Sequence, residues 1–210
     1  MPTFDIEKSL SIDGLIVGTD EAGRGPWVGP VVAAAVCFPN LDTTDFLKQS
    51  LNDSKKLSAK KRELLFDEIH KSGALIGIGQ ASAEEIDNIN ILQASFLAMQ
   101  RAIEQLEEKA NSNIDFVLID GNRLPKWKWP SKDIVKGDAK SLSISAASII
   151  AKVTRDRLLC CLAEEYPQYG WDKNAGYGTA QHIEALKTFG VTPHHRKSYA
   201  PIAKILNEKI

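Results

Sequence analysis

Apolar residues gather in short runs bounded by glycine or by charged residues, and each run predicts a strand of a buried sheet. The expected strands are residues 14–20, 28–38, 74–81, 116–120 and a short one within 133–138. A glycine-rich turn at residues 23–26 joins the first two. The chain therefore opens with a pair of strands.

Apolar residues at helical spacing, preceded by capping residues, predict the helices. Ser58 fits the N-cap of a helix that ends near Gly73, and Ser82 with Glu85 forms a capping-box signature. The helix after Ser82 is expected to run to about residue 110, with a break near Asn90. Further helices are expected at 143–166, which we interpret as amphipathic, at 180–189 and at 200–207.

This order of elements favours an α/β layer fold whose sheet contains both antiparallel and parallel pairings. A length of 210 residues suits one domain, so we expect residues 1–210 to form a single unit, with about residues 180–210 as its helical C-terminal extension. No apolar run approaches the ~18 residues that a membrane span needs, and no signal peptide is visible. We therefore expect a cytoplasmic protein with no membrane partner.

Composition and charge narrow the function classes. With 43% hydrophobic and 25% charged residues, the chain is neither disordered nor a coiled coil. The cysteines Cys37, Cys160 and Cys161 are too few for a disulfide framework and are expected to be buried. A net charge of -1 gives no general attraction to nucleic acid. Basic residues concentrate at 55–62 and 123–140, which indicates either a local basic face or a lysine-rich solvated surface.

Acidic residues stand at the ends of predicted strands. Asp20 and Glu21 end the first strand, Asp120 ends the strand at 116–120, and Asp138 follows the last. One such acid is usually a turn residue or a helix cap, but three strand ends with acids make a shared site a strong competitor. Carboxylates in one pocket repel one another unless cations lie among them, and all-oxygen ligands favour Mg²⁺ or Mn²⁺. The pattern predicts metal-dependent phosphodiester chemistry.

Two further features have competing interpretations. The sequence Gly23-Arg24-Gly25 is either a tight turn or a bare backbone that a ligand can approach, with Arg24 ready for a phosphate. His194 and His195 point apart in an extended segment and have no Cys or third His nearby. We expect them to be surface residues rather than zinc ligands.

Several motifs together resemble the bacterial ribonuclease HII family. They are GTDEAGRGP at 18–26, DSKKL at 53–57, DGN at 120–122, KGD at 136–138, SAASIIAKVTRD at 145–156 and GYGT at 176–179. The resemblance covers about residues 14–200. It implies a ribonuclease H-like mixed β-sheet flanked by helices, and endonucleolytic cleavage of RNA in RNA/DNA hybrids. It also implies incision on the 5′ side of single ribonucleotides in duplex DNA, which leaves a 3′-hydroxyl and a 5′-phosphate.

The same resemblance implies a catalytic set that binds two Mg²⁺ or Mn²⁺ ions. Its members are Asp20, Glu21, Asp120 and Asp138. Asp156 competes for the fourth place, but it stands four residues after Lys152 on a predicted helix, where an ion pair is the expected role. The implied partners are RNA/DNA hybrids and ribonucleotide-containing duplex DNA, bound by a monomer.

The resemblance also assigns contacts to the sugar at the cleavage site. The backbone of Gly23, Arg24 and Gly25 is implied to sense the 2′-hydroxyl, the group that distinguishes RNA from DNA. Tyr177 is implied to pack against the sugar of the nucleotide beyond the junction. Trp127 and Trp129 either stack on bases or, as we expect, pack against the sheet.

Five residues are candidates for contacts to the phosphate backbone. They are Lys55, Lys56, Ser145, Ser148 and Lys152. The first two are implied by resemblance alone. The other three lie on one helix face and suit phosphates, or else they are ordinary polar residues of a helix N-terminus.

Two alternative functions stay open. Another nuclease of the ribonuclease H superfamily would use the carboxylates without a 2′-hydroxyl sensor. A non-catalytic nucleic-acid-binding module would keep only the fold. Cleavage of an all-DNA duplex would favour the first alternative, and binding without metal-stimulated turnover would favour the second.

Overall fold

A computed structural model describes residues 1–208 and contains a five-stranded mixed sheet in the order β3-β2-β1-β4-β5. The central strand β1 (Ile16–Ala22) pairs antiparallel with β2 (Val31–Cys37), which pairs antiparallel with β3 (Leu75–Ala81). On its other side β1 pairs parallel with β4 (Phe116–Asp120), which pairs parallel with β5 (Ser131–Ile134). The predicted mixed sheet is confirmed.

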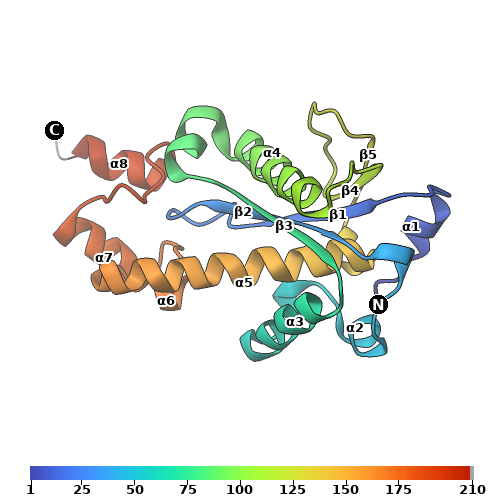
Figure 1. Ribbon diagram of the computed structural model, residues 1–210. Helices are drawn as coiled ribbons and strands as arrows, with labels where there is room; N and C mark the ends of the chain where they lie inside the picture. The colour runs from blue at the N-terminus through green and yellow to red at the C-terminus, as the bar shows by residue number, and fades with distance from the viewer. Residues whose placement is uncertain (209–210) are drawn as a thin grey trace.

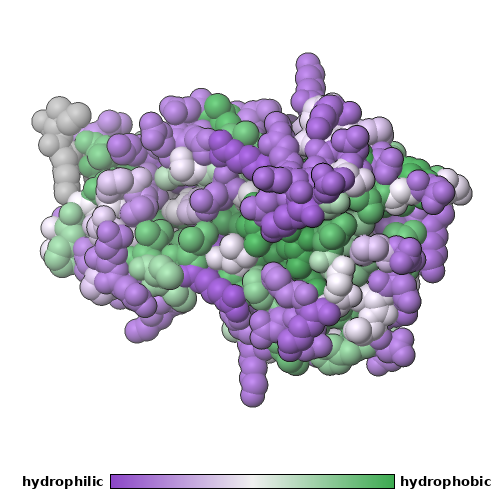
Figure 2. Space-filling view, in the orientation of Figure 1, coloured by the Kyte–Doolittle hydropathy of each residue, from purple (hydrophilic) through white to green (hydrophobic). Residues whose placement is uncertain are grey.

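Two long helices cover the two faces of this sheet (Figure 1). Helix α4 (Ala83–Ala110) packs on one face, and α5 (Leu142–Glu165) lies along the other face beside α3 (Ala59–Lys71). In the space-filling view, hydrophobic residues show in a band between α4 and α3, where the edge strand β3 lies (Figure 2). None of the helices in residues 1–208 is long and apolar enough to cross a membrane.

Short elements complete the described chain. The helices are α1 (Asp5–Ser9), α2 (Asp45–Ser50), α6 (Trp171–Asn174), α7 (Ala180–Phe189) and α8 (Ala200–Glu208), and the 3-10 turns are η1 (Pro39–Leu41), η2 (Ser54–Lys56), η3 (Gly137–Ala139) and η4 (Pro167–Tyr169). Helices α6 to α8 lie at the end of the sheet where β1 turns into β2 (Figure 1). Val28 from that turn packs with Trp171 and Leu186 in a small hydrophobic core.

The capping signals in the sequence mark real helix starts. The Ser58 side chain accepts a hydrogen bond from the Lys61 N–H at the start of α3. Ser82 and Glu85 form the reciprocal capping box of α4. The predicted break in α4 is also present, because Asn90 has φ 66° and ψ 163°.

Helix α5 differs from the amphipathic helix that we predicted. Every residue from Leu142 through Ala151 is buried, since this half lies between the sheet and its covering helices. A Cβ atom on Gly18 of β1 would lie 2.3 Å from the Ile144 nitrogen, so only glycine allows the helix this close to the central strand. Only the second half of α5 alternates between buried and solvent-facing positions.

Three local expectations were wrong. Cys160 and Cys161 are exposed, because they lie on the outer side of the second half of α5. His195 is buried, with its ring packed edge-on against the stacked rings of Tyr169 and Trp171. His194, its sequence neighbour, is half-buried and also contacts the Trp171 ring.

Two strand boundaries also differ from the prediction. The strand expected at 28–38 forms only over Val31–Cys37, because residues 28–30 are bonded to the C-terminal part of the chain instead. The strand expected within 133–138 ends at Ile134. Lys136 then adopts a left-handed conformation with φ 56° and turns the chain into η3, which carries Asp138.

A candidate active site at the ends of the central strands

Asp20 and Asp120 occupy neighbouring strands at the same end of the sheet. Thr19 of β1 is paired with Ile119 of parallel β4, so the next residue on each strand is an aspartate. Asp20 is 9% exposed, and its carboxylate accepts a hydrogen bond from the Glu21 N–H at 2.7 Å. The parallel pairing thus joins acids that lie 100 residues apart in sequence.

Asp138 reaches the same place from a turn rather than from a strand. The Asp120 carboxylate accepts a hydrogen bond from the Gly137 N–H at 2.6 Å. This contact ties η3 to the end of β4 and brings Asp138 close enough for the Asp120 charge to raise the pKa of Asp138. The four predicted acids therefore converge, although one of them comes from an element that was not predicted.

Burial and mutual repulsion raise the pKa values of three of these acids. The pKa of Asp20 lies well above its usual range because of burial, then because of the charges of Glu21, Asp120 and Asp138. Burial also raises the pKa of Glu21, although the Arg24 guanidinium at 3.2 Å opposes the shift. The site therefore holds more negative charge than its own cations neutralise.

The pKa of Asp138 is raised by burial first, then by the charges of Asp120 and Asp53. Lys55 acts in the opposite direction on both Asp138 and Glu21, which places its ammonium group near the acids. Asp53 and Lys55 both belong to the turn around η2, where Asp53 caps the Lys55 N–H at 2.9 Å.

The donor set fits a hard divalent cation. All four groups are carboxylates, and Mg²⁺ and Mn²⁺ favour oxygen ligands. Within residues 1–208, no three Asp, Glu, His or Cys side chains are grouped tightly enough to hold an ion as they stand. Burial and, for Asp20 and Asp138, the neighbouring carboxylates raise the pKa values of these acids, and a bound cation would offset both effects.

A cavity of about 420 Å³ opens beside the acids. It is lined by Glu21, Arg24 and Asp120 together with Ser95, whose buried hydroxyl has no hydrogen-bond partner, and Arg123. The cavity thus combines acidic groups with two guanidinium groups, as a site for a phosphate and its counter-ions requires.

The glycine-rich turn at residues 23–26 contacts Tyr177. A Cβ atom on Gly25 would lie 3.3 Å from Cε1 of Tyr177, so the ring rests against the Gly25 backbone. Tyr177 is 53% exposed and leaves most of its ring open to a ligand. Arg24 and Gly25 are exposed as well.

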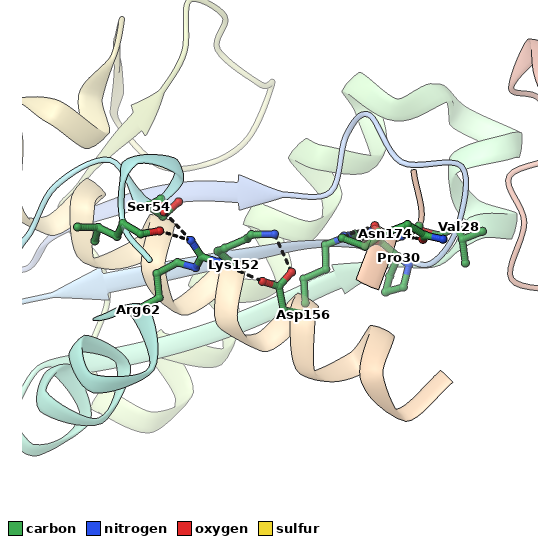
Figure 3. A network of polar contacts seen from close by, with 11 residues as sticks. Val28, Pro30, Ser54, Arg62, Lys152, Asp156 and Asn174 are labelled. Atoms are coloured by element: carbon green, nitrogen blue, oxygen red, sulfur yellow. Dashed lines mark hydrogen bonds and ion pairs between the residues drawn. The ribbon is translucent and has the colours of Figure 1, made fainter. Parts of the chain in front are cut away.

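Asp156 is an ion-pair residue, as its spacing predicted. Its carboxylate lies 2.7 Å from Lys152 Nζ and 3.8 Å from Arg62 Nη2. Figure 3 shows Asp156 facing both cations. Arg62 also donates to the Ser54 and Leu57 carbonyls at 3.1 and 2.6 Å, and so supports the turn around η2.

The other residues predicted to contact nucleic acid differ in how exposed they are. Lys55 and Lys56 are exposed. Ser145 and Ser148 are inside the protein, at 0% and 3% exposure, and therefore present little surface to a phosphate. Trp127 and Trp129 pack against the core under α4, and Trp129 donates a hydrogen bond to Glu107 at 2.8 Å.

Several residues near the site were not singled out from the sequence. Asp53 and Arg155 lie inside the motifs at 53–57 and 145–156 and could have been found there. Ser95 and Arg196 had no local signal, because each reaches the site region only through the fold.

A family model for ribonuclease HII matches residues 17–202. The chain belongs to the ribonuclease HII family. A ribonuclease HII of Wolbachia pipientis subsp. Culex pipiens is 52% identical over 96% of this chain and 97% of its own length. A ribonuclease HII of Paramagnetospirillum magneticum is 50% identical over 96% and 98%. Members of the ribonuclease HII family are hydrolases that act on RNA in hybrids, so the predicted endoribonuclease activity is confirmed.

Solved structures agree with the ribonuclease HII fold. The ribonuclease H2 of Pyrococcus horikoshii superposes with a TM-score of 0.72 at 27% identity, covering 92% of this chain and 98% of that one. Bst-RNase HIII in complex with Mn²⁺ gives 0.68 at 16% identity, covering 92% and 70%, and shows the fold alone. Enzymes of the ribonuclease H family depend on metal ions, and two-metal-ion hydrolysis is typical of them.

Proposed function

We propose that this enzyme cuts on the 5′ side of a ribonucleotide, both in RNA/DNA hybrids and at single ribonucleotides embedded in duplex DNA. The products carry a 3′-hydroxyl and a 5′-phosphate. The observation that carries the proposal is the convergence of Asp20, Glu21, Asp120 and Asp138 beside a Gly-Arg-Gly turn in which Arg24 and Gly25 are exposed.

The four carboxylates would hold Mg²⁺ or Mn²⁺, which when bound supply an activated water and neutralise charge at the scissile phosphate. The chain prepares this site by fixing its own side chains. Asp20 and Asp120 are each held by a backbone N–H, and Glu21 is restrained by Arg24. Arg24 is 52% exposed at its side chain and can turn from Glu21 to a phosphate oxygen.

The neighbouring groups supply the selectivity. The backbone of residues 23–25 would bond the 2′-hydroxyl, and Tyr177, whose ring rests beside Gly25, would pack on the adjoining sugar. Lys55, close to the acids, suits a backbone phosphate. All four carboxylates come from one chain, which supports action as a monomer, and we place the enzyme in the cytoplasm.

The test uses an end-labelled DNA duplex with one ribonucleotide, incubated with Mg²⁺, Mn²⁺ or EDTA, and maps the cut. We expect metal-dependent cleavage immediately 5′ of the ribonucleotide, and none of the matched all-DNA duplex. Cleavage of long RNA/DNA hybrids without cleavage at the single ribonucleotide would contradict the proposed incision at embedded ribonucleotides. Equal cleavage of the all-DNA duplex would contradict the 2′-hydroxyl sensor.

A further inference from the structure

The loop between β1 and β2, residues 23–30, is shaped by the C-terminal third of the chain. The Trp27 N–H donates to the Gly176 carbonyl at 2.8 Å, and the Gly29 N–H donates to the His194 carbonyl at 2.9 Å. The Arg196 N–H in turn donates to the Trp27 carbonyl at 2.8 Å. The turn that carries the proposed 2′-hydroxyl sensor is therefore held by residues about 150 or more positions away.

The side chain of Arg196 makes the densest set of these contacts. Its guanidinium is fully buried and donates to the carbonyls of Gly23 at 2.6 Å, Arg24 at 3.0 Å and Pro26 at 2.7 Å. It also donates twice to the Gly29 carbonyl, at 3.1 and 3.0 Å. None of its acceptors within residues 1–208 is a carboxylate.

A buried guanidinium is tolerated only when its N–H groups are satisfied, and its hydrogen bonds are stronger than those of neutral donors. The loop carbonyls are therefore held firmly, although glycines at 23 and 25 would otherwise leave this backbone free to rotate. Arg24 receives a second restraint, since its carbonyl also accepts a hydrogen bond from the Tyr199 hydroxyl.

Holding these carbonyls fixes the amide groups on the other side of the same peptide planes. No peptide bond in residues 1–208 is cis, so each N–H points opposite to the carbonyl of the residue before it. The Gly23 and Arg24 carbonyls point inward to Arg196. The N–H groups of Arg24 and Gly25 consequently point away from the buried guanidinium, on the exposed side of the turn.

We propose that Arg196 is a positioning residue that sets the preference for a ribonucleotide, because it aims the Arg24 and Gly25 amide groups through the carbonyls of the same peptide planes. Arg196 itself does not touch the nucleic acid. The inference rests on the proposed function, since it concerns how the Gly23–Gly25 sensor is held.

The test compares two constants for each variant. The first is kcat/KM for the duplex with one ribonucleotide, and the second is Ki for the matched all-DNA duplex as a competitive inhibitor. Lysine keeps the charge at position 196 but cannot span the Gly23 and Gly29 carbonyls together. For Arg196→Lys we expect kcat/KM to fall about tenfold or more, as the loss of one or two charge-assisted hydrogen bonds implies, with Ki unchanged within about twofold.

Leu106→Ala is the control for lost stability. Leu106 of α4 is buried beside Gly77, in the half of β3 that is farther from the loop, and its replacement should leave both constants near the wild-type values at a temperature where the variant is folded. If Arg196→Lys does not fold, Tyr199→Phe provides a second test of the same restraint. It removes one restraint on the Arg24 carbonyl and should lower kcat/KM severalfold, again without changing Ki.

Equal losses in kcat/KM and in all-DNA affinity would overturn the inference, because Arg196 would then shape the duplex surface in general. It would also be overturned if folded Arg196→Lys and Tyr199→Phe behaved like Leu106→Ala. Failure of the wild-type enzyme to cut at the ribonucleotide would instead contradict the proposed function itself.

Discussion

Asp138 and Asp156 carry the same carboxylate in opposite electrostatic surroundings. Burial and then the like charges of Asp120 and Asp53 raise the pKa of Asp138, whereas Asp156 lies between Lys152 and Arg62. A raised folded-state pKa means that stabilisation is present when Asp138 is protonated and is lost as the pH rises through that pKa. At neutral pH the charged Asp138 therefore weakens folding, whereas Asp156 forms ion pairs with Lys152 and Arg62.

We predict that Asp138→Asn lowers turnover at least about a hundredfold, the effect expected for damage to a metal site, without lowering the free energy of unfolding in EDTA. Asp156→Asn should cost about 1 kcal/mol of stability, because the pair is partly solvated, and should keep turnover within several-fold. Urea unfolding and single-ribonucleotide cleavage measure both effects. The reverse pattern would exchange the two roles.

Some residues of the candidate site could be predicted from local sequence patterns, and others could not. Asp20, Glu21 and Asp120 could be predicted because acids that end parallel neighbouring strands meet at one edge. Asp138 does come near the other acids, but from η3 rather than from the end of a strand, since the left-handed Lys136 turns the chain there. No pattern around Arg196 indicates where its guanidinium lies, because the carbonyls that accept its hydrogen bonds are more than 160 residues away.

Among the elements, α3 and α4 were predictable because their starting signals are local side-chain caps. The complete burial of the first half of α5 could not be predicted, because it depends on which other elements pack around the helix. Glu7 of α1 contacts the first turn of α5. Its fully buried carboxylate accepts hydrogen bonds from the Ser141 hydroxyl at 2.6 Å and from the Ser143 N–H at 3.3 Å. A helix N-terminus favours a negative charge there.

Glu7→Ala should therefore destabilise the protein by about 1–3 kcal/mol, because it leaves buried donors at the start of α5 without their acceptor. Asp5→Ala on the same short helix removes an exposed carboxylate and should change the free energy of unfolding by less than about 0.5 kcal/mol. Chemical denaturation of both variants makes the comparison. Equal effects would show that α1 matters only as a whole and that Glu7 does not support α5.

At the scale of the molecule, the candidate site includes residues from both halves of the chain. The acids come from β1, β4 and η3, while the loop at residues 23–30 and Tyr177 are held by segments that also pack α6 to α8. Within this C-terminal core the imidazoles of His182 and His195 face each other, with their Nε2 atoms 3.1 Å apart. His182 also contacts the Tyr177 carbonyl through Nδ1 at 2.9 Å.

This histidine pair should make stability fall with acidification. Burial, followed by the charge of His182, lowers the pKa of His195 to about 3, and burial lowers the pKa of His182 as well. The folded protein therefore keeps His195 neutral, whereas the unfolded chain takes up a proton near pH 6.5. The contribution is complete above pH 6.5 and is lost as the pH falls toward 3, with a loss of about 1.4 kcal/mol at pH 5.5 for His195 alone.

The raised pKa values of Asp20, Glu21 and Asp138 act in the opposite direction, so the histidine effect is measured as a difference between variants. His195→Asn keeps a polar group at the site but removes the titration. We expect it to be less stable than the wild type at pH 7.5, and this deficit to shrink by about 1.4 kcal/mol at pH 5.5. Urea unfolding at the two pH values measures the change. A deficit that stays constant would show that His195 is protonated as readily in the folded protein as in the unfolded chain.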